Sequence, residues 1–121
     1  MTDFSAIKEN RDFHRLYRRG KSAVHPLLIT YAARNSLGYC RVGITAGKKI
    51  GNAVTRNRAK RVIRAAFRSV CGDMDGCYDF VFVARSATAA AKSTIVARTM
   101  LEQLKKLGCV KAESSYEEDS H

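Results

Sequence analysis

The sequence contains no apolar run near the roughly 20 residues that a membrane-spanning helix needs. Its first five residues also lack the charged and then apolar layout of a secretion signal. We therefore expect a cytoplasmic protein that has no membrane partner.

Metal-binding and catalytic patterns are absent as well. The four cysteines form no C-x-x-C pair, and the three histidines complete no zinc pattern. Without a secretion signal we expect free thiols, although Cys71 and Cys77 could be bridged in an oxidising setting. A protein phosphodiesterase would need clustered carboxylates or a pair of histidines. Neither lies near residues 56–68, the most basic segment of the chain. We expect no catalytic residue, no metal site of the protein's own and no small-molecule substrate.

Negative charge is scarce outside the last part of the chain. The 121 residues are 45% hydrophobic, which suits one domain with a core, and they carry a formal net charge of +11. Residues 109–121 hold one lysine against four acidic residues, so residues 1–108 carry a net charge of +14. We predict a domain over 1–108 and a disordered acidic tail over 109–121. One hypothesis for the tail is that it covers the basic surface and weakens non-specific binding of polyanions.

The strongest functional signal is the basic segment 56–68, which contains no acidic residue, glycine or proline. At about 100° per residue, its apolar side chains share one face of a helix, and its cations, except Arg58, share the other. Arg56, Lys60, Arg64 and Arg68 form an i,i+4 ladder of like charge, which repels itself. A polyanion is the expected partner. The alternatives are a general nucleic-acid-binding module without a cleavage partner and, more weakly, a membrane-surface protein.

The hydrophobic pattern predicts helices over 10–19 and 93–107 and strands over 27–33, 40–46 and 78–85. The basic helix lies between the last two strands. The order helix, strand, strand, helix, strand, helix predicts a single-domain α/β (α+β) sandwich, a small sheet with helices packed on it. If the strands around the basic helix are parallel, the general rule gives a right-handed crossover.

Side-chain placement follows from the same periodicity. We expect Phe67, Phe80 and Phe82 in the core. The final helix should turn four residues inward, namely Ile95, Leu101, Leu104 and Leu107.

Three aromatic residues permit two interpretations. Phe13 and Tyr17 are i,i+4 neighbours on the first helix, and Tyr31 belongs to a strand that could lie beneath them. Such a stripe is a core face in one interpretation and a stacking surface for unpaired bases in the other.

The segment Lys48–Arg64, which reads KKIGNAVTRNRAKRVIR, closely resembles the signature of the bacterial ribonuclease P protein subunit. The resemblance covers roughly residues 4–108. It implies a ribosomal-protein-like domain with a left-handed β-α-β crossover. It also implies a cofactor of an RNA enzyme that cleaves precursor tRNA to form the mature 5′ end. Catalysis would then belong to ribonuclease P RNA, with magnesium bound mainly by that RNA.

The resemblance further implies two binding surfaces. The residues matched to catalytic-RNA binding, with Arg68 added from the charge ladder, are Lys48, Lys49, Arg56, Asn57, Arg58, Lys60, Arg61, Arg64 and Arg68. The residues matched to binding of the single-stranded 5′ leader of precursor tRNA are Phe13, Tyr17 and Tyr31. Two positions depart from the usual pattern: Gly47 replaces a small polar residue, and Ala65 replaces an acidic or amide residue.

Overall fold

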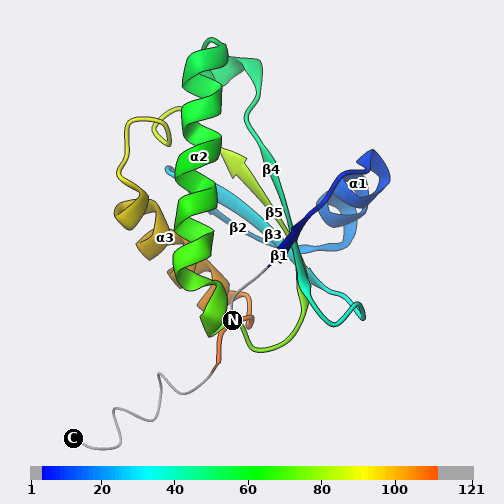
Figure 1. Ribbon diagram of the computed structural model, residues 1–121. Helices are drawn as coiled ribbons and strands as arrows, with labels where there is room; N and C mark the ends of the chain where they lie inside the picture. Colours follow the sequence, from blue (N-terminus) through cyan, green and yellow to red (C-terminus); the bar gives the residue numbers. More distant parts are fainter. Residues whose placement is uncertain (1–3, 112–121) are drawn as a thin grey trace, which may run out of the picture.

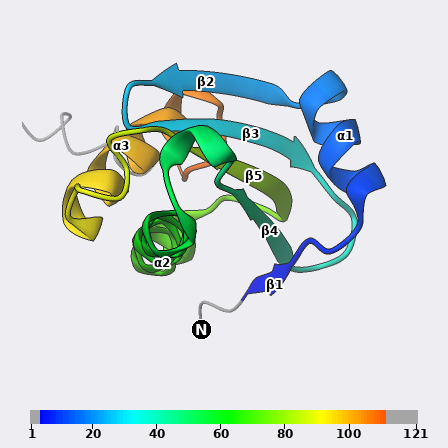
Figure 2. The same cartoon turned by 90° about the horizontal axis from the view of Figure 1, so that it is seen from above.

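The computed structural model describes residues 4–111, which form three layers (Figures 1 and 2). Helix α1 (Asn10–Arg19) covers one face of a five-stranded sheet. Helices α2 (Ala53–Val70) and α3 (Ser93–Lys106) lie side by side on the other face. The predicted class, a small sheet with helices packed on it, is confirmed.

The sheet contains the three predicted strands and two that the sequence analysis missed. Its order is β1 (Phe4–Ala6), β4 (Cys40–Thr45), β5 (Tyr78–Ala84), β3 (Leu28–Arg34) and β2 (Lys21–His25). β4 is parallel to β1 and β5, whereas β3 is antiparallel to β5 and β2. The missed strands β1 and β2 are the two edges of the sheet. Both are short and mostly exposed, so they lack the apolar run that marks a buried strand.

The crossover from β4 through α2 to β5 is left-handed. Seen from the α2 side with both strands pointing up, the chain moves from right to left (Figures 1 and 2). The general expectation of a right-handed crossover is therefore wrong, and the one implied by the resemblance is confirmed. A right-handed connection would place β5 on the other side of β4, where it would lose its pairing with β3. That loss would take from the most buried strand of the sheet its antiparallel partner, with which it pairs over seven residues.

The main core lies between the sheet and helices α2 and α3. Phe67, on α2, is fully buried, and its ring centroid lies 5.4 Å from that of Phe80 and 5.5 Å from that of Phe82. All three were expected in the core. A smaller cluster on the opposite face of the sheet is built from Ile7, Leu16 and Val81. Helix α1 is therefore held by a much smaller apolar contact than α2 and α3.

Helix α3 turns inward a face that overlaps the predicted one, including Leu104, but is rotated away from Ile95. Its buried residues are Val96, Met100, Gln103 and Leu104. Leu101 and Leu107 pack partly on the core, as expected, but Ile95 is 39% exposed. The expectation for Ile95 is therefore wrong.

The reason is a buried polar anchor. The Thr30 hydroxyl donates to Oε1 of Gln103 at 2.6 Å, and Nε2 of Gln103 donates to the carbonyls of Ala23 and Leu28. Burying this amide requires partners for all of its polar atoms, and that requirement fixes the rotation of the helix.

The chain remains packed beyond residue 108, where the tail was expected to begin. Cys109 is buried, and Val110 forms an antiparallel bridge with Met74. Residues 112–121 lie outside the described residues. Cys77 is a free thiol, so the alternative Cys71–Cys77 bridge is not formed. Within residues 4–111, no helix combines the length and apolar character needed to cross a membrane.

Candidate nucleic-acid interface

The basic helix α2 is longer than the predicted 56–68 segment and begins with a defined cap. Asn52 is its N-cap, and the Asn52 side chain accepts a hydrogen bond from the Thr55 amide at 2.9 Å. Gly51, just before the cap, has φ +145°, which side-chain-bearing residues rarely adopt. A short 3₁₀ turn, η1 (Lys48–Ile50), precedes it. Loop and helix therefore present their cations as one continuous feature.

The apolar and cationic faces of α2 are separated as predicted. Ala59, Ile63, Ala66, Phe67 and Val70 are buried. The polar residues matched to RNA binding are exposed, apart from Arg56 and Lys60, which are half-buried. The ion pairs found within residues 4–111 include none of the cations of the loop or of α2. Their charges are therefore available to an external anion.

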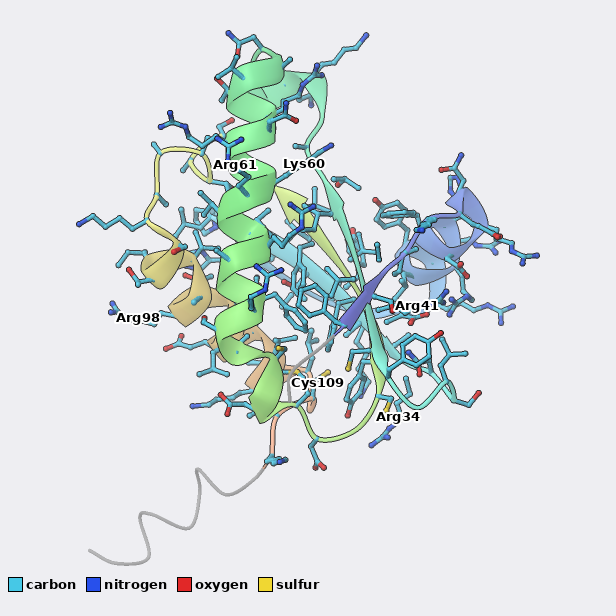
Figure 3. The ribbon with its side chains drawn as sticks, in the orientation of Figure 1. Arg34, Arg41, Lys60, Arg61, Arg98 and Cys109 are labelled. Atoms are coloured by element: carbon cyan, nitrogen blue, oxygen red, sulfur yellow. The ribbon has the colours of Figure 1, made fainter. Side chains whose placement is uncertain are left out.

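The structure divides these cations between two grooves. Lys60, Arg64 and Arg68 line a groove of about 390 Å³ on the β4 side of the helix. Arg58 and Arg61 line another, of about 530 Å³, against the loop that precedes α3. Figure 3 shows Lys60 and Arg61 on opposite sides of α2. The single cationic arc inferred from the sequence is therefore two surfaces.

The three predicted aromatic residues lie on the α1 side of the sheet. The rings of Tyr17 and Tyr31 meet edge to face, with centroids 5.0 Å apart. The Phe13 ring packs directly on the backbone of β4 at Gly43. The contact is so close that a Cβ atom added to Gly43 would lie 2.6 Å from two ring carbons of Phe13. Phe13 and Tyr31 are half-buried and Tyr17 is 39% exposed. Phe13 and Tyr31 therefore pack against the small core, as the first interpretation expects, whereas Tyr17 leaves ring surface exposed, and base stacking stays a prediction.

The aromatic face and the basic helix meet at the edge of β4. Strand β1 ends at Ala6, opposite Val42, so the next residues of β4 have no strand beside them on that edge. The groove at this opening is lined by Phe13 and Gly43 on one side and by Lys60, Arg64 and Arg68 on the other. The two surfaces predicted separately are joined by this groove, which we call the edge groove.

The sequence analysis missed the buried charge cluster that holds α1 in place. Asp79, on β5, is fully buried and accepts hydrogen bonds from Arg15, Arg41 and Asn35 at 2.7–3.0 Å. Asp12, on α1, pairs with the same two arginines. The signal in the sequence was an acidic residue inside the most apolar strand, which implies a paired charge.

Burial and hydrogen bonding oppose each other at Asp79. Burial alone raises the pKa of its carboxyl group, but the hydrogen bonds from Arg41, Asn35 and Arg15 outweigh burial and lower that pKa. The Asp79 carboxylate in turn raises the pKa of Arg41. The cluster is therefore ionised at neutral pH and fixes the helix that carries Phe13 and Tyr17.

The described residues do not fit a magnesium site of the protein's own. Within 4–111, no three histidine, cysteine, aspartate or glutamate side chains are grouped so that they could hold a metal ion. The carboxylates nearest the aromatic face, those of Asp12 and Asp79, are already bound by Arg15 and Arg41.

A cationic helix joined by a groove to an aromatic sheet face is the arrangement of a small α/β protein that binds nucleic acid. The model of the Ribonuclease P family matches residues 1–108. The "Ribonuclease P protein component" of Clostridium botulinum (strain Loch Maree / Type A3) is 38% identical over 103 residues, covering 84% of this chain and 93% of that protein. The protein of the same name from Alkaliphilus metalliredigens is 34% identical over 107 residues, 88% and 96% of the two chains.

Solved structures agree with these relatives. The RNase P protein of Staphylococcus aureus has a TM-score of 0.75 at 30% identity, covering 88% of this chain and 97% of that one. The RNase P protein from Thermotoga maritima has a TM-score of 0.71 at 26% identity, covering 81% and 93%. The chain belongs to the ribonuclease P protein family. Its function is that of the RNA-binding subunit of this ribonucleoprotein of tRNA processing, and a general nucleic-acid module is not favoured.

Proposed function

We propose that this subunit holds the catalytic RNA with α2 and its preceding loop, and holds the 5′ leader of precursor tRNA on its aromatic face. Cleavage to the mature 5′ end then belongs to the RNA subunit, in the cytoplasm. The observation that carries the proposal is the edge groove, because Phe13 and three cations of α2 line it together. A single RNA strand leaving the aromatic face therefore has a cationic path towards the helix.

The helix and its loop suit a folded RNA. Guanidinium groups pair bidentately with phosphates, and an unpaired row of them favours a surface of dense negative charge. The proposed contacts are those of the full predicted set: Lys48, Lys49, Arg56, Asn57, Arg58, Lys60, Arg61, Arg64 and Arg68. Because this set lies on both sides of α2, we propose that the helix inserts between RNA elements.

The aromatic face suits a single strand. Stacking of one base on an aromatic ring contributes about 1–3 kcal/mol to the binding free energy, whichever base it is. Such a surface can therefore bind leaders of different sequence. Tyr17 is exposed and Tyr31, whose ring it contacts, is half-buried, while Phe13 lines the edge groove.

The side chains of this protein contribute binding and orientation to the reaction. Magnesium bound mainly by the RNA would supply the chemistry of the cleavage step, and no residue of this protein would have to hold it. The cations of α2 and the loop reduce repulsion between the two RNAs and fix their relative position. Leader binding favours precursor over product, because mature tRNA has no leader.

The test measures the affinity of reconstituted holoenzyme for precursor and mature tRNA. Replacing Tyr17 or Tyr31 with alanine should weaken precursor binding roughly tenfold, from about 1.4 kcal/mol of lost stacking, and leave mature tRNA unchanged. Tyr39→Ala is the matched control, because Tyr39 is exposed in the turn before β4, away from these rings. An equal loss for both tRNAs would contradict the leader site.

The helix surface needs a separate measurement. Arg64→Ala should weaken binding of the protein to ribonuclease P RNA and reduce the salt dependence of that binding by about one counterion. Arg98→Ala, which removes an exposed arginine from α3, is the control. If both variants bind the RNA equally well, α2 is not the contact.

A further inference from the structure

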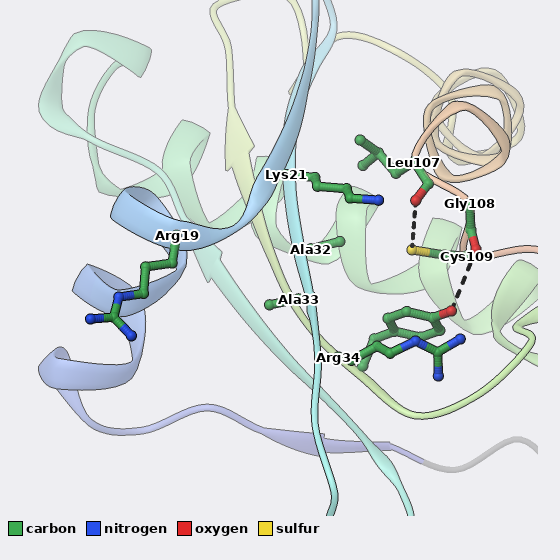
Figure 4. Close-up of a pocket in the computed structure, with 9 residues that line it drawn as sticks. Arg19, Lys21, Ala32, Ala33, Arg34, Leu107, Gly108 and Cys109 are labelled. Carbon is green, nitrogen blue, oxygen red and sulfur yellow. Dashed lines mark hydrogen bonds between the residues drawn. The ribbon is translucent and has the colours of Figure 1, made fainter.

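A third cationic groove lies away from the two grooves of α2, beside the segment that follows α3 (Figure 4). It has a volume of about 400 Å³, and its wall is formed by β2 and β3 on one side and by Leu107 and Cys109 on the other. Three cations line it: Arg19 at the end of α1, Lys21 on β2 and Arg34 on β3. We call it the terminal groove.

Arg34 is held in position rather than extended into solvent. Its guanidinium carbon lies 5.2 Å from the centroid of the Tyr78 ring, a cation–π contact. The Tyr78 hydroxyl donates to the Asp75 carbonyl at 3.0 Å and lies 3.4 Å from the Gly108 carbonyl, and these contacts fix the ring. Gly76 provides room, because a Cβ atom there would lie 3.1 Å from Nη1 of Arg34.

The charges of the terminal groove have no acidic partner within the described part of the chain. The ion pairs of residues 4–111 leave out Arg19, Lys21 and Arg34. The sequence that follows directly, residues 112–121, contains no lysine or arginine and four acidic residues, Glu113, Glu117, Glu118 and Asp119. The groove and this segment therefore have opposite charge.

We propose that residues 112–121 dock in the terminal groove of the same chain when no RNA is bound. Cys109 forms part of the groove wall, and the Lys111 amide donates to the Asp73 carbonyl at 3.1 Å, so the segment starts beside the groove. Ten residues reach about 33 Å when extended, far enough to cross it. Attachment to the same chain gives the segment a local concentration in the millimolar range, which compensates for weak individual contacts.

Docking has a consequence for RNA binding. Each exposed ion pair contributes little and is screened by salt, so the docked state depends on several pairs together and dissociates as salt rises. While docked, the segment lowers the positive potential that attracts RNA without sequence preference. The proposal concerns this groove alone and does not depend on the leader site.

The test compares amide NMR spectra of two full-length chains, the natural one and one in which Glu113, Glu117 and Glu118 become glutamine and Asp119 becomes asparagine. At 50 mM salt we expect shifts confined to the groove, around Arg34, Tyr78 and Cys109. At 500 mM salt the two spectra should coincide. The same comparison is then made in chains that also carry Lys21→Gln and Arg34→Gln. In these chains, replacing the four acidic residues should shift no resonance of the groove. The control pair Lys92→Gln and Arg98→Gln, at and near the start of α3, should leave the shifts intact.

Several results would overturn the proposal. Shifts along α2 around Arg64 and Arg68 would mean that the segment covers the basic helix instead. Shifts that grow with protein concentration would mean docking between two chains. Identical spectra at both salt concentrations would mean that no docking occurs.

Discussion

Replacing Asp79 with asparagine keeps the shape of this buried side chain and removes its charge. The carboxylate accepts from Nε and Nη2 of Arg41, from Nη2 of Arg15 and from Nδ2 of Asn35. An amide at this position turns an N–H group towards one of these donors, and the two guanidinium groups are left with Asp12 as their acidic partner. We expect α1 to be held less tightly and the whole domain to be less stable.

The magnitude follows from the burial of the partners. Removing one member of a buried ion pair costs about 3–5 kcal/mol, because the other charge remains without compensation. The side chains of Arg15 and Arg41 are 37% and 21% exposed, so water can solvate part of their charge. We therefore expect a loss near the lower end, about 3 kcal/mol. With an m-value of about 1.5 kcal/mol per molar, this lowers the urea midpoint by about 2 M.

The pH dependence gives a second, independent readout. The folded pKa of Asp79 is lowered, so its contribution to the free energy of unfolding is complete above the unfolded value of about 3.9. The contribution is lost as the pH falls through the lower, folded pKa. The difference between the natural protein and Asp79→Asn should therefore be full at pH 7 and shrink below about pH 4. Asp75→Asn, at an exposed position, should change little at either pH. Equal urea midpoints at pH 7, or a difference that persists unchanged to pH 2.5, would refute this reasoning.

Three further substitutions test other parts of the structure. Gly43→Ala should push the Phe13 ring away from β4, cost about 1–3 kcal/mol of overpacking and weaken precursor tRNA binding, measured by urea unfolding and a binding titration. Asn52→Ala removes the cap that accepts from the Thr55 amide and should cost about 1 kcal/mol in thermal unfolding, with helix content at low temperature unchanged. Phe67→Ala empties the centre of the main core and should cost about 3–5 kcal/mol, enough to lower the melting temperature more than any of the surface variants.

The helices and central strands could be predicted because their apolar residues repeat with a clear period. Helix α2 has no internal glycine or proline, and its buried residues fall on the face that was worked out from 100° per residue. The edge strands were missed because pairing, rather than a buried side-chain pattern, makes them strands. The face of α3 was misjudged because a polar residue, Gln103, decides its rotation.

The candidate site was predictable in its membership and less so in its arrangement. Residue type and the family signature selected the cations and the aromatic rings. Lys60 and Arg61 line different grooves because different segments pack on the two sides of α2. Helical angles alone do not say which segments these are. The role of Asp79 depends on contacts across 38 and 64 residues of sequence, to Arg41 and Arg15, which no local pattern records.

The unequal covering of the two sheet faces means that this domain can open in parts. Helix α1 rests on a cluster of only three fully buried residues and on the ion pairs of Asp79, whereas α2 and α3 share the main core. Segments with little buried apolar area unfold locally at lower free energy than the whole domain. We expect the amide hydrogens of α1 to exchange with solvent faster than those of α2, and Asp79→Asn to accelerate the exchange of α1 most. Because α1 carries Phe13 and Tyr17, its local opening would separate these two rings from Tyr31, which stays on the central strand β3.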